Sequence, residues 1–232
     1  MTPPFRSAFY DLDGTLISGN IVTRYAFFAR RRPRGALHYA RLLLKVPLFL
    51  ALDLYSRRAF NEYFYREYRG LRREWLESLA DDLFDKVMRP EIHPGAQALV
   101  DGDRRAGYRV VLVTGALDFD LPPLVRHFGF DDVISNRLVF ADGAATGEVE
   151  PPVLAEETKV QALRDWCRKY NVDAAQSKAY SDSFSDLPLL EAVGQPAAVH
   201  PDRRLRQEAL RRGWPILDLK KGGHGDRSPV GS

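Results

Sequence analysis

The feature that most constrains this chain is a short apolar run that stops at two aspartates. Residues 7–10, Ser-Ala-Phe-Tyr, predict a buried strand, and Asp11-Leu12-Asp13-Gly14-Thr15 follows at once. Positions i and i+2 of a strand point the same way, so both carboxylates can face one site at its end. Gly14 permits a sharp turn there, and Thr15 can cap a helix or bind a ligand. Taken alone, the stretch is equally consistent with a solvated turn.

Beyond residue 90, strand-like runs alternate with helical patterns. Strands are expected over 108–113, 132–135, 177–180, 197–199 and 216–219, and helices over 95–106, 156–170, 186–193 and 203–212. A hairpin is expected over 138–149, with Asp142-Gly143 at its turn. Such alternation predicts an α/β fold with a doubly wound parallel sheet and right-handed crossovers.

Residues 17–89 show no strand alternation and read as helix throughout. Helical patterns cover 17–32, 36–55, 57–68 and 74–88, and Pro47 is expected to kink or break the second of them. We therefore expect a core formed by residues 1–16 and 90–221, with an all-helical insertion of about four helices at 17–89. Residues 222–232 are Gly-rich and expected to form a flexible tail.

Composition narrows the classes of function. The net charge of +3 comes from 34 basic and 31 acidic residues, which is too balanced to indicate nucleic-acid binding. The single cysteine, Cys167, excludes an intramolecular disulfide and suits a reducing compartment. The apolar stretch 42–55 is interrupted and falls short of the roughly 20 residues that cross a bilayer. We expect a soluble, cytoplasmic protein. A membrane-surface contact through the arginines at 30–34 and the stretch 42–54 is a less favoured alternative.

Polar clusters follow three of the expected strands. In doubly wound sheets, ligands bind outside the carboxyl ends of the strands. This rule brings Asp11 and Asp13 together with Thr114 and with the pair Asp182 and Asp186. Lys159, one of only seven lysines, lies on a helix that leads to the same region.

These side chains suit a phosphate monoester. Thr114 offers a hydroxyl, and Gly115 and Ala116 offer backbone N–H groups at an expected helix start, where the helix dipole favours an anion. The Lys159 ammonium can neutralise phosphate oxygens. Its alternative is a solvated lysine on a helix surface.

The carboxylates suit metal binding and covalent catalysis. Asp11 and Asp182 fit as ligands of Mg²⁺, which takes one or two carboxylates together with phosphate oxygens and water. Asp11 is then the nucleophile that forms an aspartyl-phosphate, and Asp13 exchanges protons with the leaving alcohol and the attacking water. Asp186 would hold metal-bound waters or orient Lys159. A helix cap is a compatible reading of residues 181–186.

In this order, Asp11-Leu12-Asp13-Gly14-Thr15, Thr114, Lys159 and Asp182-x-x-x-Asp186 resemble the four motifs of the haloacid dehalogenase (HAD) superfamily. The helical insertion looks like the C1 cap of that superfamily. Residues 180–190 with His200-Pro201-Asp202 are similar to its phosphoserine-phosphatase-like subfamily IB. The resemblance covers residues 5 to 219. It implies a Mg²⁺-dependent phosphatase, with the backbone carbonyl of Asp13 as a further metal ligand.

The resemblance leaves the substrate open. Phosphoserine phosphatases carry a glutamate soon after the first motif, whereas residues 16–20 contain no acid, and Thr114-Gly115-Ala116 replaces their Ser-Gly-Gly. We expect a small amino-acid or amino-alcohol phosphate, such as histidinol phosphate. The alternative is a phospholipid head-group phosphate, as in a phosphatidylglycerophosphatase-like enzyme. Cap aromatics either pack together or line the pocket: Tyr25, Phe27, Phe28, Tyr39, Phe49, Tyr55, Phe60, Tyr63, Phe64 and Tyr65.

Two non-enzymatic functions fit the sequence less well. Receiver domains, which are phospho-accepting signalling modules, also combine a parallel sheet with acidic residues, a threonine and a lysine. They lack a large helical insertion after the first strand and place the phospho-accepting aspartate later, so the motif order disfavours them. A catalytically silent binding protein is disfavoured by the complete set of acidic groups.

Overall fold

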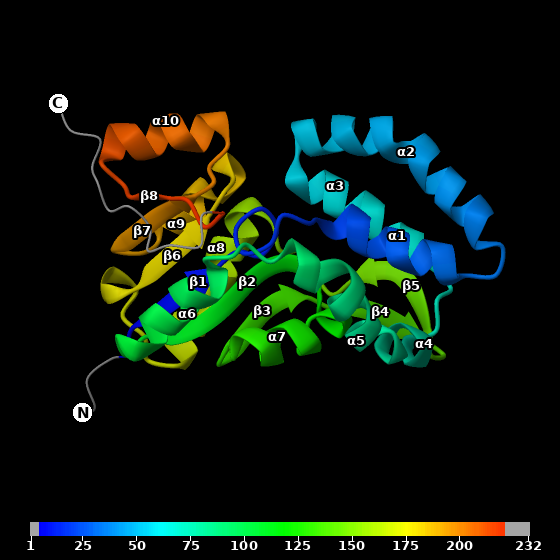
Figure 1. The fold of residues 1–232 in the computed structure, drawn as a ribbon, viewed down its shortest axis with the longest axis horizontal. Coiled ribbons are helices and arrows are strands. Elements are labelled where there is room, and N and C mark those ends of the chain that lie inside the picture. Colours follow the sequence, from blue (N-terminus) through cyan, green and yellow to red (C-terminus); the bar gives the residue numbers. More distant parts are fainter. Residues whose placement is uncertain (1–4, 221–232) are drawn as a thin grey trace.

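The computed structural model describes residues 5–220, so the predicted tail at 222–232 lies outside the described residues (Figure 1). Its centre is a six-stranded parallel sheet in the order β3-β2-β1-β6-β7-β8. The strands are β1 (Ser7–Tyr10), β2 (Arg109–Leu117), β3 (Asp132–Asn136), β6 (Lys178–Ser181), β7 (Gln195–Val199) and β8 (Ile216–Leu217). The predicted α/β architecture is confirmed.

Helices cover both faces of this sheet. The alternation of side chains along a strand explains the two layers: Ala8 and Tyr10 of β1 join one hydrophobic cluster, and Phe9 joins the other. The first cluster includes residues of α6 (Ala96–Arg105) and α7 (Pro122–Phe128). The second includes residues of α8 (Glu156–Lys169), α9 (Leu187–Glu191) and α10 (Arg203–Arg212).

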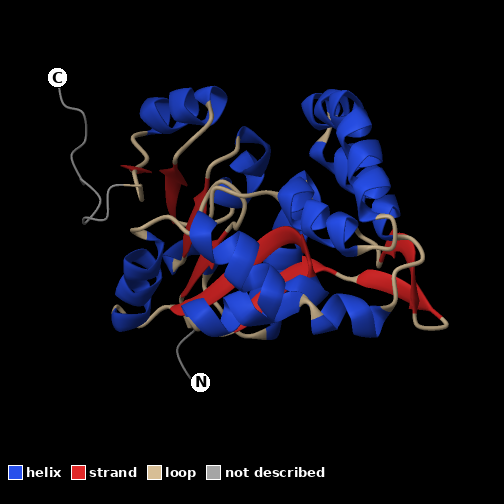
Figure 2. Ribbon diagram, turned by 45° about the vertical axis from the view of Figure 1, so that its right-hand side comes forward, coloured by secondary structure: helices blue, strands red, loops and turns tan. Residues whose placement is uncertain are grey.

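In the sequence, the helical insertion comes after β1 and before β2, and we call it the cap (Figure 2). It contains α1 (Ile21–Arg31), α2 (Gly35–Tyr55), α3 (Arg57–Phe64), α4 (Arg73–Ser78) and α5 (Ala80–Leu83). Of the kink or break expected at Pro47, the break is wrong, since α2 runs through this residue. A proline leaves the carbonyl four residues earlier, at Leu43, without a donor. Both residues are exposed, so water can bond this carbonyl.

Helix α2 also corrects the expectation that this part of the chain is too short to cross a bilayer. Its first 18 residues, Gly35–Leu52, have a mean hydropathy of 1.3, and 11% of this window is buried. By length and composition α2 is the one helix among residues 5–220 that could cross a membrane. The expectation that the helix is too short rested on the apolar residues 42–55 alone, although the helix itself was predicted over 36–55.

A β-hairpin of β4 (Leu138–Ala141) and β5 (Ala144–Val149) supports the cap from one side. Its turn residues Asp142 and Gly143 both have positive φ, which matches the expected tight turn. The backbone of Gly70 donates to the carbonyl of Ala145, and that of Arg73 donates to the carbonyl of Gly143. Cap and core also share one hydrophobic cluster. The predicted boundaries at residues 16/17 and 89/90 therefore stay a proposal.

Candidate active site

The carboxyl edge of the sheet brings the predicted residues together. Asp11 directly follows β1, Asp182 directly follows β6, Thr114 lies in the second half of β2, and Lys159 lies in the first turns of α8. These side chains line one cavity of about 300 Å³ between the sheet and the cap. The other predicted residues, Asp13, Gly115 and Asp186, line the same cavity.

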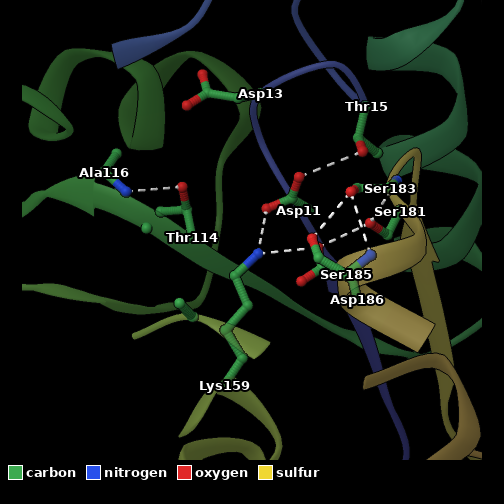
Figure 3. Close-up of polar contacts among 12 residues, drawn as sticks. Asp11, Asp13, Thr15, Thr114, Ala116, Lys159, Ser181, Ser183, Ser185 and Asp186 are labelled. Atoms are coloured by element: carbon green, nitrogen blue, oxygen red, sulfur yellow. Dashed lines mark hydrogen bonds and ion pairs between the residues drawn. The ribbon is translucent and has the colours of Figure 1, made fainter. Parts of the chain in front are cut away.

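Lys159 links two of the predicted carboxylates (Figure 3). Its Nζ donates to Asp11 Oδ1 at 2.8 Å and to Asp186 Oδ2 at 2.9 Å. Ser181 Oγ also donates to Asp186 Oδ2, at 2.8 Å. Burial lowers the pKa of Lys159, but the neighbouring charges of Asp11 and Asp186 outweigh it and raise this pKa above its usual value. The ammonium is therefore charged, and it lies between the carboxylates of Asp11 and Asp186.

The positive charge of Lys159 does not balance the negative charge of the carboxylates at this site. Burial, opposed by Lys159, raises the pKa of Asp11 to about 6. Burial and the negative charges of Asp11 and Asp186 raise the pKa of Asp182 to about 8. Thr15 Oγ1 donates to Asp182 Oδ1 at 3.2 Å, which offsets little of this repulsion. One ammonium faces three carboxylates, of which Asp11 and Asp186 are buried and Asp182 is partly buried. This leaves a negative site that a cation would stabilise.

The donor set at this site suits Mg²⁺. Within residues 5–220 no group of three or more His, Cys, Asp or Glu side chains forms a metal site. Mg²⁺ does not require one, because it is often held by one or two carboxylates with water and phosphate oxygens. Asp11 and Asp182 provide the two carboxylates at the edge of the sheet. Thiolate- and imidazole-preferring metals have no matching ligands here.

Gly14 allows the first motif to pack against Asp182. Its φ is +83°, a conformation that L-residues with a side chain rarely adopt. A Cβ built at this position would overlap the Asp182 carboxylate. Both the turn and the close approach thus require glycine.

Asp13 does not point where the sequence analysis suggested. Its carboxylate accepts two hydrogen bonds from Arg24 of α1, with Nη1 to Oδ1 at 2.5 Å and Nη2 to Oδ2 at 2.8 Å. Figure 3 shows it turned away from Asp11. The Arg24 side chain is 1% exposed, and its Nε lies 3.5 Å from Asp120 Oδ2. Arg24 therefore joins the cap to two acidic residues of the core.

Sequence reasoning missed Arg24 and Asp120, although a signal existed for Arg24. Its position is one turn before Phe28 and next to Tyr25, which are both buried. An arginine on the apolar face of an amphipathic helix indicates a buried partner. Asp120 carried no comparable signal in the sequence.

The expected helix start at Gly115 and Ala116 is wrong. Strand β2 continues to Leu117, with a shift in its pairing with β3 between Val113 and Leu117, and α7 begins only at Pro122. The N–H of Ala116 donates to Thr114 Oγ1 at 3.0 Å. An anion at Gly115 and Ala116 would therefore meet a strand end and the Thr114 hydroxyl, and not the start of α7.

The cap closes the cavity with a mainly apolar wall. Phe49 and Phe60 are the two predicted cap aromatics that line it; the other eight are not among its lining residues. The polar cap residues at the cavity are Asn20, Arg57 and Asn61. No carboxylate of the described cap residues, 17–89, lines the cavity.

Comparisons with known proteins agree with this site. Residues 8–191 match the family model for haloacid dehalogenase-like hydrolases. A histidinol-phosphatase of Neisseria meningitidis serogroup C is 30% identical, over 92% of this chain and 98% of its own length. The "inhibition of morphological differentiation protein" of Streptomyces azureus is 34% identical, over 94% of this chain and 80% of its own length. A phosphoserine phosphatase in its apo form shares the fold with a TM-score of 0.69 at 19% identity, covering 94% of each chain.

Fold and site together define a Rossmann-like hydrolase with a helical cap. The chain belongs to the haloacid dehalogenase-like hydrolase family. The sequence predictions of this family, of its phosphoserine-phosphatase-like branch and of a phosphatase enzyme are confirmed.

Proposed function

We propose that this protein hydrolyses phosphomonoesters with Mg²⁺ and that Asp11 forms an aspartyl-phosphate. The observation that carries the proposal is the contact between buried Asp11 and the Lys159 ammonium, in a cavity shared with Asp182 and Thr114. The contact supports the proposal, because Asp11 as a nucleophile would lie next to a cation that can bind phosphate oxygens.

The reaction proceeds in two displacements at phosphorus. An Asp11 carboxylate oxygen attacks phosphorus, the ester P–O bond breaks, and the leaving alcohol takes a proton from Asp13. Asp13 then removes a proton from water, which attacks phosphorus and releases Asp11 and inorganic phosphate. Lys159, the Thr114 hydroxyl and the Gly115 backbone bind the phosphate oxygens throughout. Asp186 keeps Lys159 in position.

Asp11, Asp182 and the backbone carbonyl of Asp13 would hold the Mg²⁺ ion. When bound, Mg²⁺ offsets the repulsion between the carboxylates and the phosphate. The excess of negative charge around Asp11 and Asp182 supports this assignment.

Asp13 needs a change of rotamer before it can exchange protons with the substrate. Both of its oxygens accept from Arg24, and its side chain is 29% exposed, so water or substrate can reach it. We propose that Asp13 turns from Arg24 towards the cavity when a phosphoester binds. Arg24 is a positioning residue in this scheme.

Hydrolysis of p-nitrophenyl phosphate tests the nucleophile. The wild type is expected to release p-nitrophenol with Mg²⁺ and to lose this activity in EDTA, while Asp11→Asn falls by at least about 10³-fold because no other group replaces the nucleophile. Asp165→Asn, on the exposed surface of α8, is the matched control. Equal rates for Asp11→Asn and the wild type would remove Asp11 from the role of nucleophile.

Two classes of substrate are compatible with the cavity. The histidinol-phosphatase relative and the small cavity support a small amino-acid or amino-alcohol phosphate, our first candidate. The apolar cap wall, without a carboxylate to bind an amine, favours a phospholipid head-group phosphate as the second. A screen of phosphoserine, histidinol phosphate and phosphatidylglycerol phosphate in detergent separates them. A cytoplasmic location stays a prediction.

A further inference from the structure

The outer face of α2 exposes apolar side chains along its whole length. Exposed fractions reach 82% for Leu44, 90% for Leu54 and 85% for Tyr55. Positions 37, 44, 48 and 55 recur at intervals of seven, four and seven residues, so they form one stripe along the helix. The exposed apolar residues of this outer face are Leu37, Leu43, Leu44, Leu48, Leu50, Leu54 and Tyr55.

Only the opposite side of α2 packs against the rest of the cap. Leu42 and Phe49 are buried, and the Phe49 ring lies 6.1 Å from that of Phe60 and 5.1 Å from that of Phe64, both in α3. Nothing in residues 5–220 covers the outer face, and α2 is the outermost element of the cap in Figures 1 and 2. A contiguous apolar surface of this kind marks an interaction site.

The charges on and near the outer face of α2 indicate the kind of partner that binds it. The outer face itself carries one charged residue, Arg41, and further exposed arginines follow at both of its ends. Two copies of this chain packed through α2 would bring like charges together, whereas an anionic lipid surface complements them. Residues 30–58 contain one acidic residue, Asp53, and eight basic ones: Arg30, Arg31, Arg32, Arg34, Arg41, Lys45, Arg57 and Arg58.

We propose that α2 docks on the surface of an anionic lipid bilayer. Leu42 and Phe49 hold the helix in the cap, so it lies in the plane of the interface and does not span the membrane. The apolar stripe enters the acyl boundary, and the arginines contact lipid phosphates.

Docking would place the catalytic cavity beside the membrane. Val46, Phe49 and Leu50 of α2 line this cavity, and Leu50 is also 60% exposed on the outer face. One helix therefore forms both the docking surface and a wall of the site. The delivery of a lipid-borne phosphomonoester to Asp11 rests on the proposed phosphatase function, whereas the docking does not.

Vesicle sedimentation tests the docking. The full chain is mixed with vesicles of phosphatidylcholine alone or with added phosphatidylglycerol, at low and high salt. Binding is expected only with phosphatidylglycerol and is expected to weaken as salt rises. The double variant Leu44→Ser/Leu48→Ser should reduce the partition coefficient by about tenfold or more, since it removes two apolar side chains from the acyl boundary.

The matched control is Leu210→Ser, which removes a leucine 54% exposed on α10, outside the cap. It should bind vesicles like the wild type. Leu44 and Leu48 do not line the cavity, so their double variant should also keep its p-nitrophenyl phosphate activity in the absence of vesicles. Retained activity shows that the variant is folded.

Three outcomes would overturn the proposal: no binding to anionic vesicles, equal loss in the Leu210→Ser control, or unchanged binding by the double variant. A concentration-dependent dimer in ultracentrifugation that the double variant abolishes, without vesicle binding, would assign the face to a second copy. Asp11→Asn should bind vesicles fully. A failure of the phosphatase proposal is thereby separated from a failure of docking.

Discussion

Arg24 is the residue at which the cap meets the loop that follows β1. Its guanidinium binds both oxygens of Asp13 and lies against Asp120. Burial lowers the pKa of Arg24, but Asp13 and Asp120 outweigh this effect and raise it, so the side chain is always charged. A cap helix thus controls the orientation of a core residue that we propose to be catalytic.

Removing this guanidinium is expected to be costly. Arg24→Met leaves Asp13 and Asp120 without their cation, and the loss of one partner from a buried ion pair lowers the free energy of unfolding by about 3–5 kcal/mol. Urea denaturation measures the change. The double variant Arg24→Met/Asp120→Asn should regain part of it. Arg58→Met, 56% exposed, is the control and should change stability by less than about 0.5 kcal/mol. A similar loss in both single variants would contradict the buried role.

The titration of Asp120 makes the free energy of unfolding depend on pH. Burial, opposed by Arg24 and assisted by Asp13, raises the pKa of Asp120 to about 7. An aspartate has a pKa of about 3.9 when unfolded, so between pH 4 and 7 the folded state binds more protons at this residue. This contribution makes the free energy of unfolding fall as pH rises through that window.

The neutral variant Asp120→Asn should remove this contribution. Its stability relative to the wild type is expected to increase from pH 5 to pH 8, measured as the melting temperature at constant ionic strength. Asp165→Asn, which is exposed, should show no such trend. A constant difference between Asp120→Asn and the wild type across this range would exclude the titration.

At this scale, the sequence could predict residues that belong to motifs but not the partners that orient them. Asp11, Lys159 and Asp182 follow from strand ends and spacing, and the structure brings them to one cavity. The contact of Arg24 with Asp120 joins residues 96 positions apart, and no local pattern encodes it. The orientation of Asp13 depends on its own hydrogen bonds from Arg24.

Among the elements, α1 has the clearest local determinant. Asn20 Oδ1 accepts from the backbone N–H groups of Val22 and Thr23, and Thr23 Oγ1 accepts from that of Asn20. This reciprocal arrangement is a capping box, which fixes the start of α1 and hence the position of Arg24.

Loss of the cap residue should weaken α1. Asn20→Ala is expected to lower the free energy of unfolding by about 1 kcal/mol, whereas Asn20→Ser, which can still accept from the backbone, should cost less than half as much. Urea denaturation of the three proteins measures this. Equal losses for alanine and serine would show that the side chain acts through the cavity that it also lines.

The limits of an element could be predicted where the apolar pattern sets them. They could not be predicted where a strand is irregular. The pattern over residues 7–10 predicted β1 with its observed limits. The run Thr114-Gly115-Ala116 resembled a helix start, yet tertiary pairing with β3 extends β2 through it. Pairing between distant segments, which a local pattern does not contain, decided this case.

The whole molecule joins cap and core through one hydrophobic cluster. Phe28 of α1 stacks edge-to-face on Phe119, and Tyr68 does the same, with ring centroids 5.8 Å apart in each case. The hairpin β4–β5 adds backbone hydrogen bonds to the cap. Such shared packing favours unfolding of cap and core in one step.

Tryptophans placed in both parts allow a test. Trp75 lies in the cap, while Trp166 and Trp214 lie in the core. In the variant Trp166→Phe/Trp214→Phe, the fluorescence of Trp75 should follow the same urea midpoint as far-UV circular dichroism. The single variant Trp75→Phe, observed through the core tryptophans, is the complement. Separate midpoints would mean that the cap unfolds independently.

The central position of β1 also sets the order in which the site is assembled during synthesis. Asp11, the proposed nucleophile, is made first, but its lysine partner follows 148 residues later, and β6 must still insert beside β1. A nascent chain that ends before β6 already contains Asp11 and Lys159 but lacks Asp182 and Asp186. The enzyme therefore cannot assemble its full set of cavity carboxylates until most of its chain has left the ribosome.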